Sequence, residues 1–144
     1  MNRLLTPTPA RMDLALLVLR VVTGIVFLMH GWQKVFQYGF AGVSQGFGQM
    51  GVPMPGIMGP FIALLELIGG IALIAGVLTP VFAALLACNM VGAILLVHLK
   101  AGFFLPEGYE FALTLLAAML ALALAGAGAY SVDGVLGGRR PARS

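Results

Sequence analysis

Long apolar stretches dominate the chain and are separated by short polar or glycine-rich segments. Four stretches are long enough to cross a bilayer, because a hydrocarbon core of about 30 Å needs about 20 apolar residues in a helix. They cover residues 13–36, 57–78, 80–99 and 110–129, and none shows the period of two that a half-buried strand shows. The pattern predicts an all-α fold, a transmembrane four-helix bundle.

The connections between these helices predict their arrangement. Short links join the second helix to the third and the third to the fourth, which favours antiparallel neighbours. The segment 31–56 continues the first helix to Phe36 and is then rich in Gly, Phe and Gln, with Pro53 and Pro55 near its end. We expect a Gly/aromatic-rich interfacial loop between helices 1 and 2, within one integral membrane domain over residues 1–144.

The composition supports a membrane protein. Of the residues, 60% are hydrophobic and 9% are charged, whereas about 25% are charged in an average soluble domain. This excludes a disordered chain and argues against a water-soluble enzyme. The only cysteine, Cys88, excludes an internal disulfide and a cysteine-only metal site, and we interpret it as a small apolar filler. The net charge of +3 does not indicate nucleic-acid binding, because the basic residues do not cluster on one polar face.

The basic residues also predict the orientation. The side that holds both termini carries five of them and the opposite side carries two: Arg3, Arg11, Arg139, Arg140 and Arg143 against Lys34 and Lys100. The excess of Lys and Arg on cytoplasmic loops places both termini in the cytoplasm, in a multi-pass protein of the inner membrane. The first stretch does not read as a signal peptide, because Arg20 interrupts it and no small-x-small cleavage site follows.

Three polar residues are predicted to lie near the middle of the bilayer. We take Gly31 and Ile57 as the outer boundary on the first two helices. At about 1.5 Å of rise per residue, Arg20, Glu66 and Asn89 lie about 16, 14 and 15 Å below the outer boundary. We expect an intramembrane polar cluster in which Arg20 and Glu66 form an ion pair and Asn89 satisfies a remaining hydrogen bond. Such a pair is either part of a functional site or an architectural element that sets which helices meet.

A second polar layer is expected at the outer end of the bundle, formed by His30, Lys34, His98, Lys100 and Glu110. The histidines could relay protons or hold a ligand oxygen. The alternative is a solvated rim at the headgroups, and Glu110 could equally complement the dipole of the helix that it opens. A metal site is disfavoured, because the ligands come from separate helices with no paired motif.

Small residues occur along the predicted helices, namely Gly24, Gly31, Gly69, Gly70, Ala87 and Gly92. Small side chains let membrane helices approach closely, so we interpret these positions as packing contacts rather than as a ligand groove.

Four segments together resemble the DoxX family of small four-span membrane proteins: RVVTGIVFLMHGWQKVF, LLELIGGIALIAGVLTP, NMVGAILLVHLKAGFF and GYEFALTLLAAMLALALAGAGAYSVDGVL. The resemblance implies a four-helix bundle in the cytoplasmic membrane with both termini inside. It also implies that the characteristic polar positions of the family are Arg20, His30, Lys34, Glu66, His98, Lys100 and Glu110. The family is named from a subunit tied to thiosulfate–quinone oxidoreduction, so the resemblance suggests a redox role that depends on a partner subunit or a bound quinone.

Two functions remain open from the sequence. The first is a redox-associated accessory subunit whose polar site binds a quinone-like small molecule; a quinone is then the candidate cofactor and redox proteins are the candidate partners. The alternative is a non-catalytic membrane scaffold or partner-docking protein whose buried ion pair is structural. Both place the chain in the lipid bilayer, without nucleic acid, and a homo-oligomer fits either. Whether the protein is itself an enzyme is left open.

Overall fold

The computed structural model describes residues 6–141, and all regular structure within them is helical. The helices, in chain order, are α1 (Pro9–Trp32), α2 (Gly39–Gln49), α3 (Pro55–Ala75), α4 (Thr79–Ala93), α5 (Glu110–Ala125) and α6 (Val132–Leu136). Two π-helical segments, Gln33–Tyr38 and Ile94–His98, and the 3₁₀ turn Leu99–Ala101 complete them. The predicted all-α membrane bundle is confirmed. Arg3 and Arg143, counted for the orientation, lie outside the described residues.

Within residues 6–141, three helical stretches are long and apolar enough to cross a membrane by length and composition: 9–49, 55–75 and 79–101. The fourth predicted stretch forms a shorter apolar helix, α5, with 16 residues and a length of about 24 Å. It ends four residues before the predicted boundary at residue 129. Gly126 and Gly128 have φ values of 78° and 77°, a backbone conformation that glycine adopts readily and that no α-helix contains.

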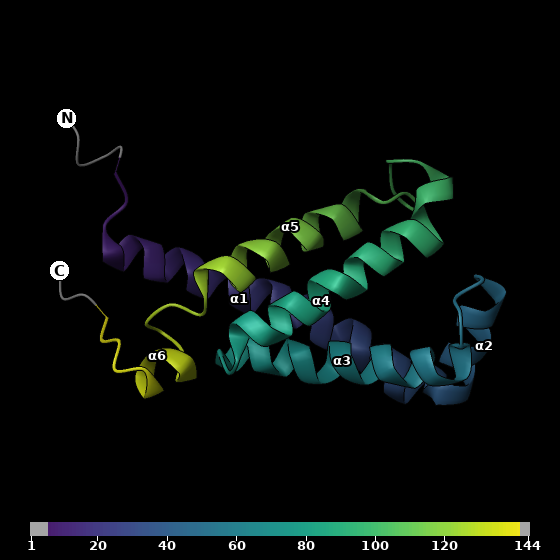
Figure 1. Cartoon of the computed structure of the whole chain (residues 1–144), viewed down its shortest axis with the longest axis horizontal. Coiled ribbons are helices and arrows are strands. Elements are labelled where there is room, and N and C mark those ends of the chain that lie inside the picture. The colour runs from purple at the N-terminus through teal and green to yellow at the C-terminus, as the bar shows by residue number, and fades with distance from the viewer. Residues whose placement is uncertain (1–5, 142–144) are drawn as a thin grey trace.

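The segment after the first span differs from the expected loop. It is helical almost throughout, first as the π-helical segment Gln33–Tyr38 and then as α2. The helical path bends at Gly39, whose φ is 69°. The true break comes later, where Gly51 has a φ of 79° and Pro53 precedes α3. In Figure 1, α2 lies at one end of the bundle and α6 lies at the other.

Helices α1 and α3 pack backbone to backbone through glycines. A Cβ atom on Gly31 would lie 2.2 Å from the Leu67 nitrogen, and one on Gly70 would lie 2.4 Å from the Leu28 nitrogen. Only a residue without a side chain fits such spacing, as in other closely packed membrane helices. The packing role expected for Gly31 and Gly70 is confirmed.

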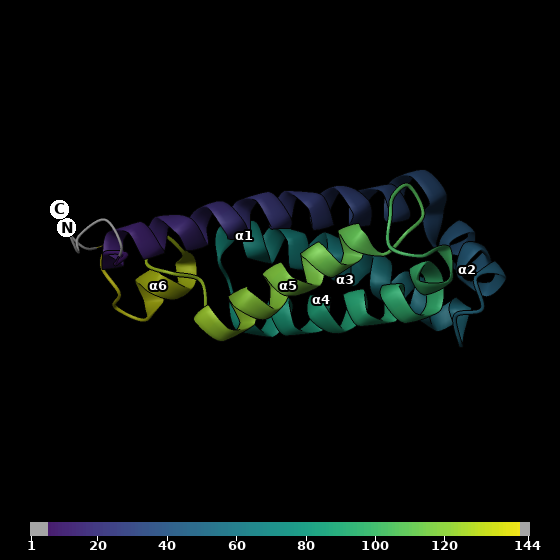
Figure 2. The same ribbon diagram turned by 90° about the horizontal axis from the view of Figure 1, so that it is seen from above.

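The second helix pair, α4 and α5, diverges from the first toward the α2 end (Figure 1). Near the α3–α4 turn the pairs are in contact, since a Cβ on Gly69 would lie 3.1 Å from Leu86 Cδ1. Figure 2 shows α1 along one side of the molecule for its full length. The fully buried side chains between the pairs are Phe27, Leu73, Leu86, Met119 and Leu122. The result is a wedge, closed at the α6 end and wider at the α2 end.

Candidate functional site

Three polar side chains from three elements meet inside this wedge, and we call them the polar triad: Lys34, Glu66 and Asn89. The Lys34 ammonium forms an ion pair with Glu66 Oε2. The Asn89 side-chain amide donates to Glu66 Oε1 over 2.9 Å. Glu66 is only 5% exposed, so both carboxylate oxygens receive their compensation from neighbouring side chains. The structure thus brings Glu66 and Asn89 together as the sequence predicts, with Lys34 as the cation.

Arg20 does not pair with Glu66, and this part of the predicted cluster is wrong. The Arg20 side chain is 1% exposed and donates to three main-chain carbonyls. Its Nη1 reaches Leu73 O at 2.8 Å and Ile74 O at 2.6 Å, and its Nη2 reaches Tyr130 O at 2.6 Å. The guanidinium therefore caps the carboxyl end of α3, where Leu73 O otherwise accepts only from the Gly76 N–H at 3.2 Å and Ile74 O has no helical partner.

The error lies in the register of two long helices. The prediction aligned Gly31 with Ile57 as the outer boundary of the membrane. In the structure Gly31 lies against Leu67, and Gly24 lies against Ile74. Glu66 therefore sits opposite Gly31, eleven residues or about 16 Å beyond Arg20. Because the first helix continues into its π-helical extension, Lys34 reaches the carboxylate from one turn further along.

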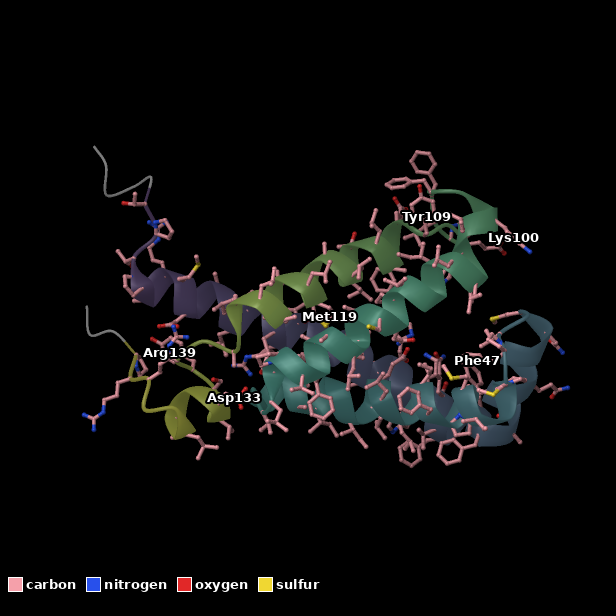
Figure 3. All side chains as sticks on the ribbon, in the orientation of Figure 1. Phe47, Lys100, Tyr109, Met119, Asp133 and Arg139 are labelled. Carbon is pink, nitrogen blue, oxygen red and sulfur yellow. The ribbon has the colours of Figure 1, made fainter. Side chains whose placement is uncertain are left out.

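Arg20 belongs to a second group at the α6 end, which we call the terminal hub. The Asp133 carboxylate accepts from the Leu78 N–H at 2.8 Å and the Thr79 N–H at 2.9 Å, so it caps the start of α4 from outside that helix. Asp13 accepts from the Ala129 N–H at 2.9 Å. Ser131 caps α6 through the Gly134 N–H. Figure 3 shows Asp133 at this end and Phe47 at the other.

Sequence reasoning missed the hub residues Asp13 and Asp133. Ser131 could have been recognised, because serine is among the residues most favoured at the N-cap of a helix. Asp133 gave no such signal, since its hydrogen-bond partners are more than 50 residues away along the chain. These contacts fasten the segment after α5 to the α3–α4 turn.

The expected outer polar layer is only partly assembled. His98 Nδ1 lies 2.8 Å from Glu107 O, and a Glu110 carboxylate oxygen accepts from the Leu105 N–H at 2.8 Å. Both contacts organise the α4–α5 connection, where Figure 3 also shows Tyr109 and Lys100. Lys100 is exposed, and no salt bridge to it is present among residues 6–141. His30 lies beside Phe111, with ring centroids 6.3 Å apart.

A cavity of about 600 Å³ occupies the wide part of the wedge. Its polar lining consists of His30, Lys34, Glu66, Asn89 and His98, and most of the remaining lining is apolar. Sites for small molecules are typically cavities of about 300–1,000 Å³ with few polar groups in an apolar wall. The cavity thus joins the polar triad to two residues that the sequence assigned to a separate outer layer.

The lining retains unused hydrogen-bonding capacity. A carbonyl oxygen only accepts, so His98 Nδ1 donates to Glu107 O, and His98 Nε2 is left without a partner among the described residues. Among the described residues, neither ring nitrogen of His30 has a hydrogen-bond partner, and Asn89 Oδ1 accepts from none. Lys34 has three N–H donors, and its hydrogen bond to Glu66 Oε2 uses one of them. A polar group entering this cavity would find both donors and acceptors.

The family model named DoxX matches residues 15–99. The chain belongs to the DoxX family. The match includes the whole polar triad, His30 and His98, whereas Glu110 and Asp133 follow it.

Curated relatives extend this DoxX relationship over most of the chain. A Bacillus subtilis (strain 168) protein with the name "Putative oxidoreductase CatD" is 41% identical over 110 residues, 76% of this chain and 79% of its own length. The "Inner membrane protein YqjF" of Escherichia coli (strain K12) is 36% identical over 129 residues, 86% of this chain and 93% of its own. The "Uncharacterized membrane protein Rv3486" of Mycobacterium tuberculosis is 30% identical, over 83% of this chain and 79% of its own. No solved structure matches this DoxX chain significantly.

Proposed function

We propose that this DoxX-family protein is a redox-associated accessory protein of the inner membrane that binds a neutral, quinone-like molecule in the cavity between its two helix pairs. The observation that carries the proposal is the polar triad inside a largely apolar cavity of about 600 Å³. The names of two relatives agree with it: one is "Putative oxidoreductase CatD" and the other is "Inner membrane protein YqjF".

The charge balance of the triad supports a neutral ligand. Lys34 and Glu66 neutralise each other, so the cavity wall offers no uncompensated charge to an ionic group. A charged ligand would lose its hydration without gaining an opposite charge, which is costly in a low-dielectric site. A neutral group with hydrogen-bonding oxygens is the better fit.

The unused donors and acceptors support a ring with carbonyl or hydroxyl oxygens. The remaining N–H groups of Lys34 can donate to a carbonyl oxygen, and Asn89 Oδ1 can accept from a hydroxyl. Apolar side chains such as Phe27, Leu65 and Leu115 line the same cavity and would contact the ring. A quinone presents the acceptor and its quinol presents the donor, so one site suits both redox forms.

The positions of the basic residues support the orientation with both termini in the cytoplasm. Arg11 lies in the first turn of α1, and Arg139 and Arg140 follow α6 at the same end of the bundle. Lys100 lies at the opposite end, in the α4–α5 connection. The positive-inside tendency then places the terminal hub toward the cytoplasm and the cavity toward the outer leaflet.

Binding of a defined quinone tests the proposal. We would measure the dissociation constant of a benzoquinone with a ten-carbon chain for the purified protein in phosphatidylcholine nanodiscs. The double variant Lys34→Met/Glu66→Leu removes the polar groups and leaves no unpaired charge, and it is expected to bind at least about tenfold more weakly. Gln45→Leu changes an exposed polar residue of α2 outside the cavity and is expected to bind like the wild type. Equal binding by the double variant and the wild type would refute the proposal.

A further inference from the structure

Two gaps between the helix pairs border the cavity, and they differ in what fills them. On the side formed by α1 and α5, the partly exposed rings of His30 and Phe111 (41% exposed) lie beside each other, with ring centroids 6.3 Å apart. On the side formed by α3 and α4, three cavity-lining residues are also exposed at the surface: Phe61 (51% exposed), Leu85 (42% exposed) and Cys88. In a bilayer these side chains face both the cavity and the lipid.

Gly92 leaves space in the α3–α4 gap. It follows Cys88 by one helical turn on the same face of α4, and it lines the cavity. A Cβ atom built on Gly92 meets nothing within 4 Å, in contrast to Gly31 and Gly70 in the α1–α3 interface. The packing role that the sequence suggested for Gly92 is therefore wrong, and this glycine keeps a notch open.

The notch lies close to the polar triad. Asn89 follows Cys88 directly and follows Leu85 by one turn. The exposed residues of α4 at the gap are therefore adjacent to Asn89, which donates a hydrogen bond to Glu66. On α3, Ile62 lies one turn before Glu66 and lines the cavity beside Phe61. An apolar path thus runs from the lipid-facing surface of α3 and α4 to the triad.

We propose that this gap is a tail subsite, formed by Phe61, Leu85, Cys88 and Gly92, through which an alkyl chain of the ligand extends into the lipid. The inference rests on the proposed function and narrows the ligand to a lipid-borne molecule with a neutral oxygenated head and an alkyl tail. The head contacts the polar triad, and the tail leaves between α3 and α4. The ligand would enter the cavity laterally from the bilayer rather than from water.

Filling the notch tests the subsite. We would measure binding of the ten-carbon benzoquinone and of the same ring without its chain to the wild type, Gly92→Ala, Gly92→Phe and Gly56→Phe. Gly92→Phe is expected to weaken binding of the chain-bearing quinone about tenfold, as for the loss of roughly two buried methylene groups, and to change tail-less binding less than threefold. The affinity of Gly92→Ala for the chain-bearing quinone is expected to fall between those of the wild type and Gly92→Phe. Gly56, exposed in the first turn of α3 with nothing within 4 Å of its Cβ, is the matched control. Equal losses for both quinones, or none for the long one, would overturn the subsite.

If the wild type binds no quinone, that result refutes the proposed function. A second measurement then still tests whether an alkyl chain enters the α3–α4 gap. Phosphatidylcholine with a diazirine in its acyl chain is photolysed in proteoliposomes, and the labelled peptides are identified. A chain that enters the gap labels Leu65 and Met90, which are buried and line the cavity, and Gly92→Phe abolishes this labelling. Labelling confined to outward residues such as Ile68, or unchanged in Gly92→Phe, would overturn the inference.

Discussion

The terminal hub and the polar triad both place charged side chains inside an apolar bundle, but they use those charges differently. In the hub, Arg20 and Asp133 contact main-chain groups at the carboxyl end of α3 and the start of α4. In the triad, Lys34, Glu66 and Asn89 contact one another and line a cavity.

The difference separates an architectural role from a binding role. Main-chain partners of the hub are present in every folded molecule. Of its buried side-chain nitrogens and oxygens within residues 6–141, Arg20 Nε and Thr79 Oγ1 lack a partner. The triad satisfies its own charges and keeps further donors and acceptors directed at an apolar space. Burial of a charge is therefore a poor guide to function by itself, and the identity of its partners discriminates better.

Loss of the Arg20 side chain should have the largest effect on stability. Arg20→Leu removes the donor to two carbonyls at the α3 terminus and to the Tyr130 carbonyl before α6, and we expect a loss of about 3–5 kcal/mol in the free energy of unfolding. Denaturation in mixed micelles would measure it. Arg11→Leu, at an exposed position of the same helix, should change stability by less than about 0.5 kcal/mol. If Arg20→Leu were as stable as the wild type, the result would contradict the architectural role of the hub.

A methyl group in the α1–α3 interface should have the next largest effect. Gly31→Ala forces a Cβ to within 2.2 Å of the Leu67 nitrogen, so the helices must separate at a cost of about 1–3 kcal/mol. Denaturation in mixed micelles would measure this loss of stability. Gly46→Ala, where a Cβ meets nothing within 4 Å, should be neutral or slightly stabilising. Equal effects of the two substitutions would contradict the backbone-to-backbone packing.

Removal of the Asp133 carboxylate should have a moderate and local effect. Asp133→Ala leaves the first N–H groups of α4 uncapped, which costs about 0.5–2 kcal/mol. Hydrogen exchange should accelerate at the Leu78 and Thr79 amides. Glu107→Ala, which removes an exposed carboxylate, should leave exchange at both amides unchanged. Exchange rates that do not respond to Asp133→Ala would show that this cap is dispensable.

Replacement of the ion pair in the triad by apolar residues should have the smallest effect on stability. Lys34→Met/Glu66→Leu is expected to change the free energy of unfolding by less than about 1 kcal/mol, because both charges leave together. Either single substitution should be more destabilising, since it strands the other charge. A double variant that unfolds as readily as Arg20→Leu would instead give the triad the architectural role of the hub.

The sequence was sufficient for the four main apolar helices and for part of the site, but not for α2 and α6. Hydrophobic runs predicted the all-α bundle, and glycines such as Gly31 and Gly70 were recognised as contacts. The predicted pairing of Arg20 with Glu66 was wrong, because it depended on the register of two helices. Counting from assumed boundaries misplaced that register by ten residues, or about 15 Å. Asp133 was out of reach for a related reason, since only the tertiary fold brings it to α4.

Native mass spectrometry of the detergent-extracted protein tests the central claim most directly, because it reports what the cavity holds. The wild type is expected to carry a neutral small molecule with an alkyl chain and carbonyl or hydroxyl oxygens. Asp133→Ala, altered only in the hub, is expected to keep it, and Lys34→Met/Glu66→Leu is expected to lose it. Identical spectra for the wild type and the double variant would contradict the account.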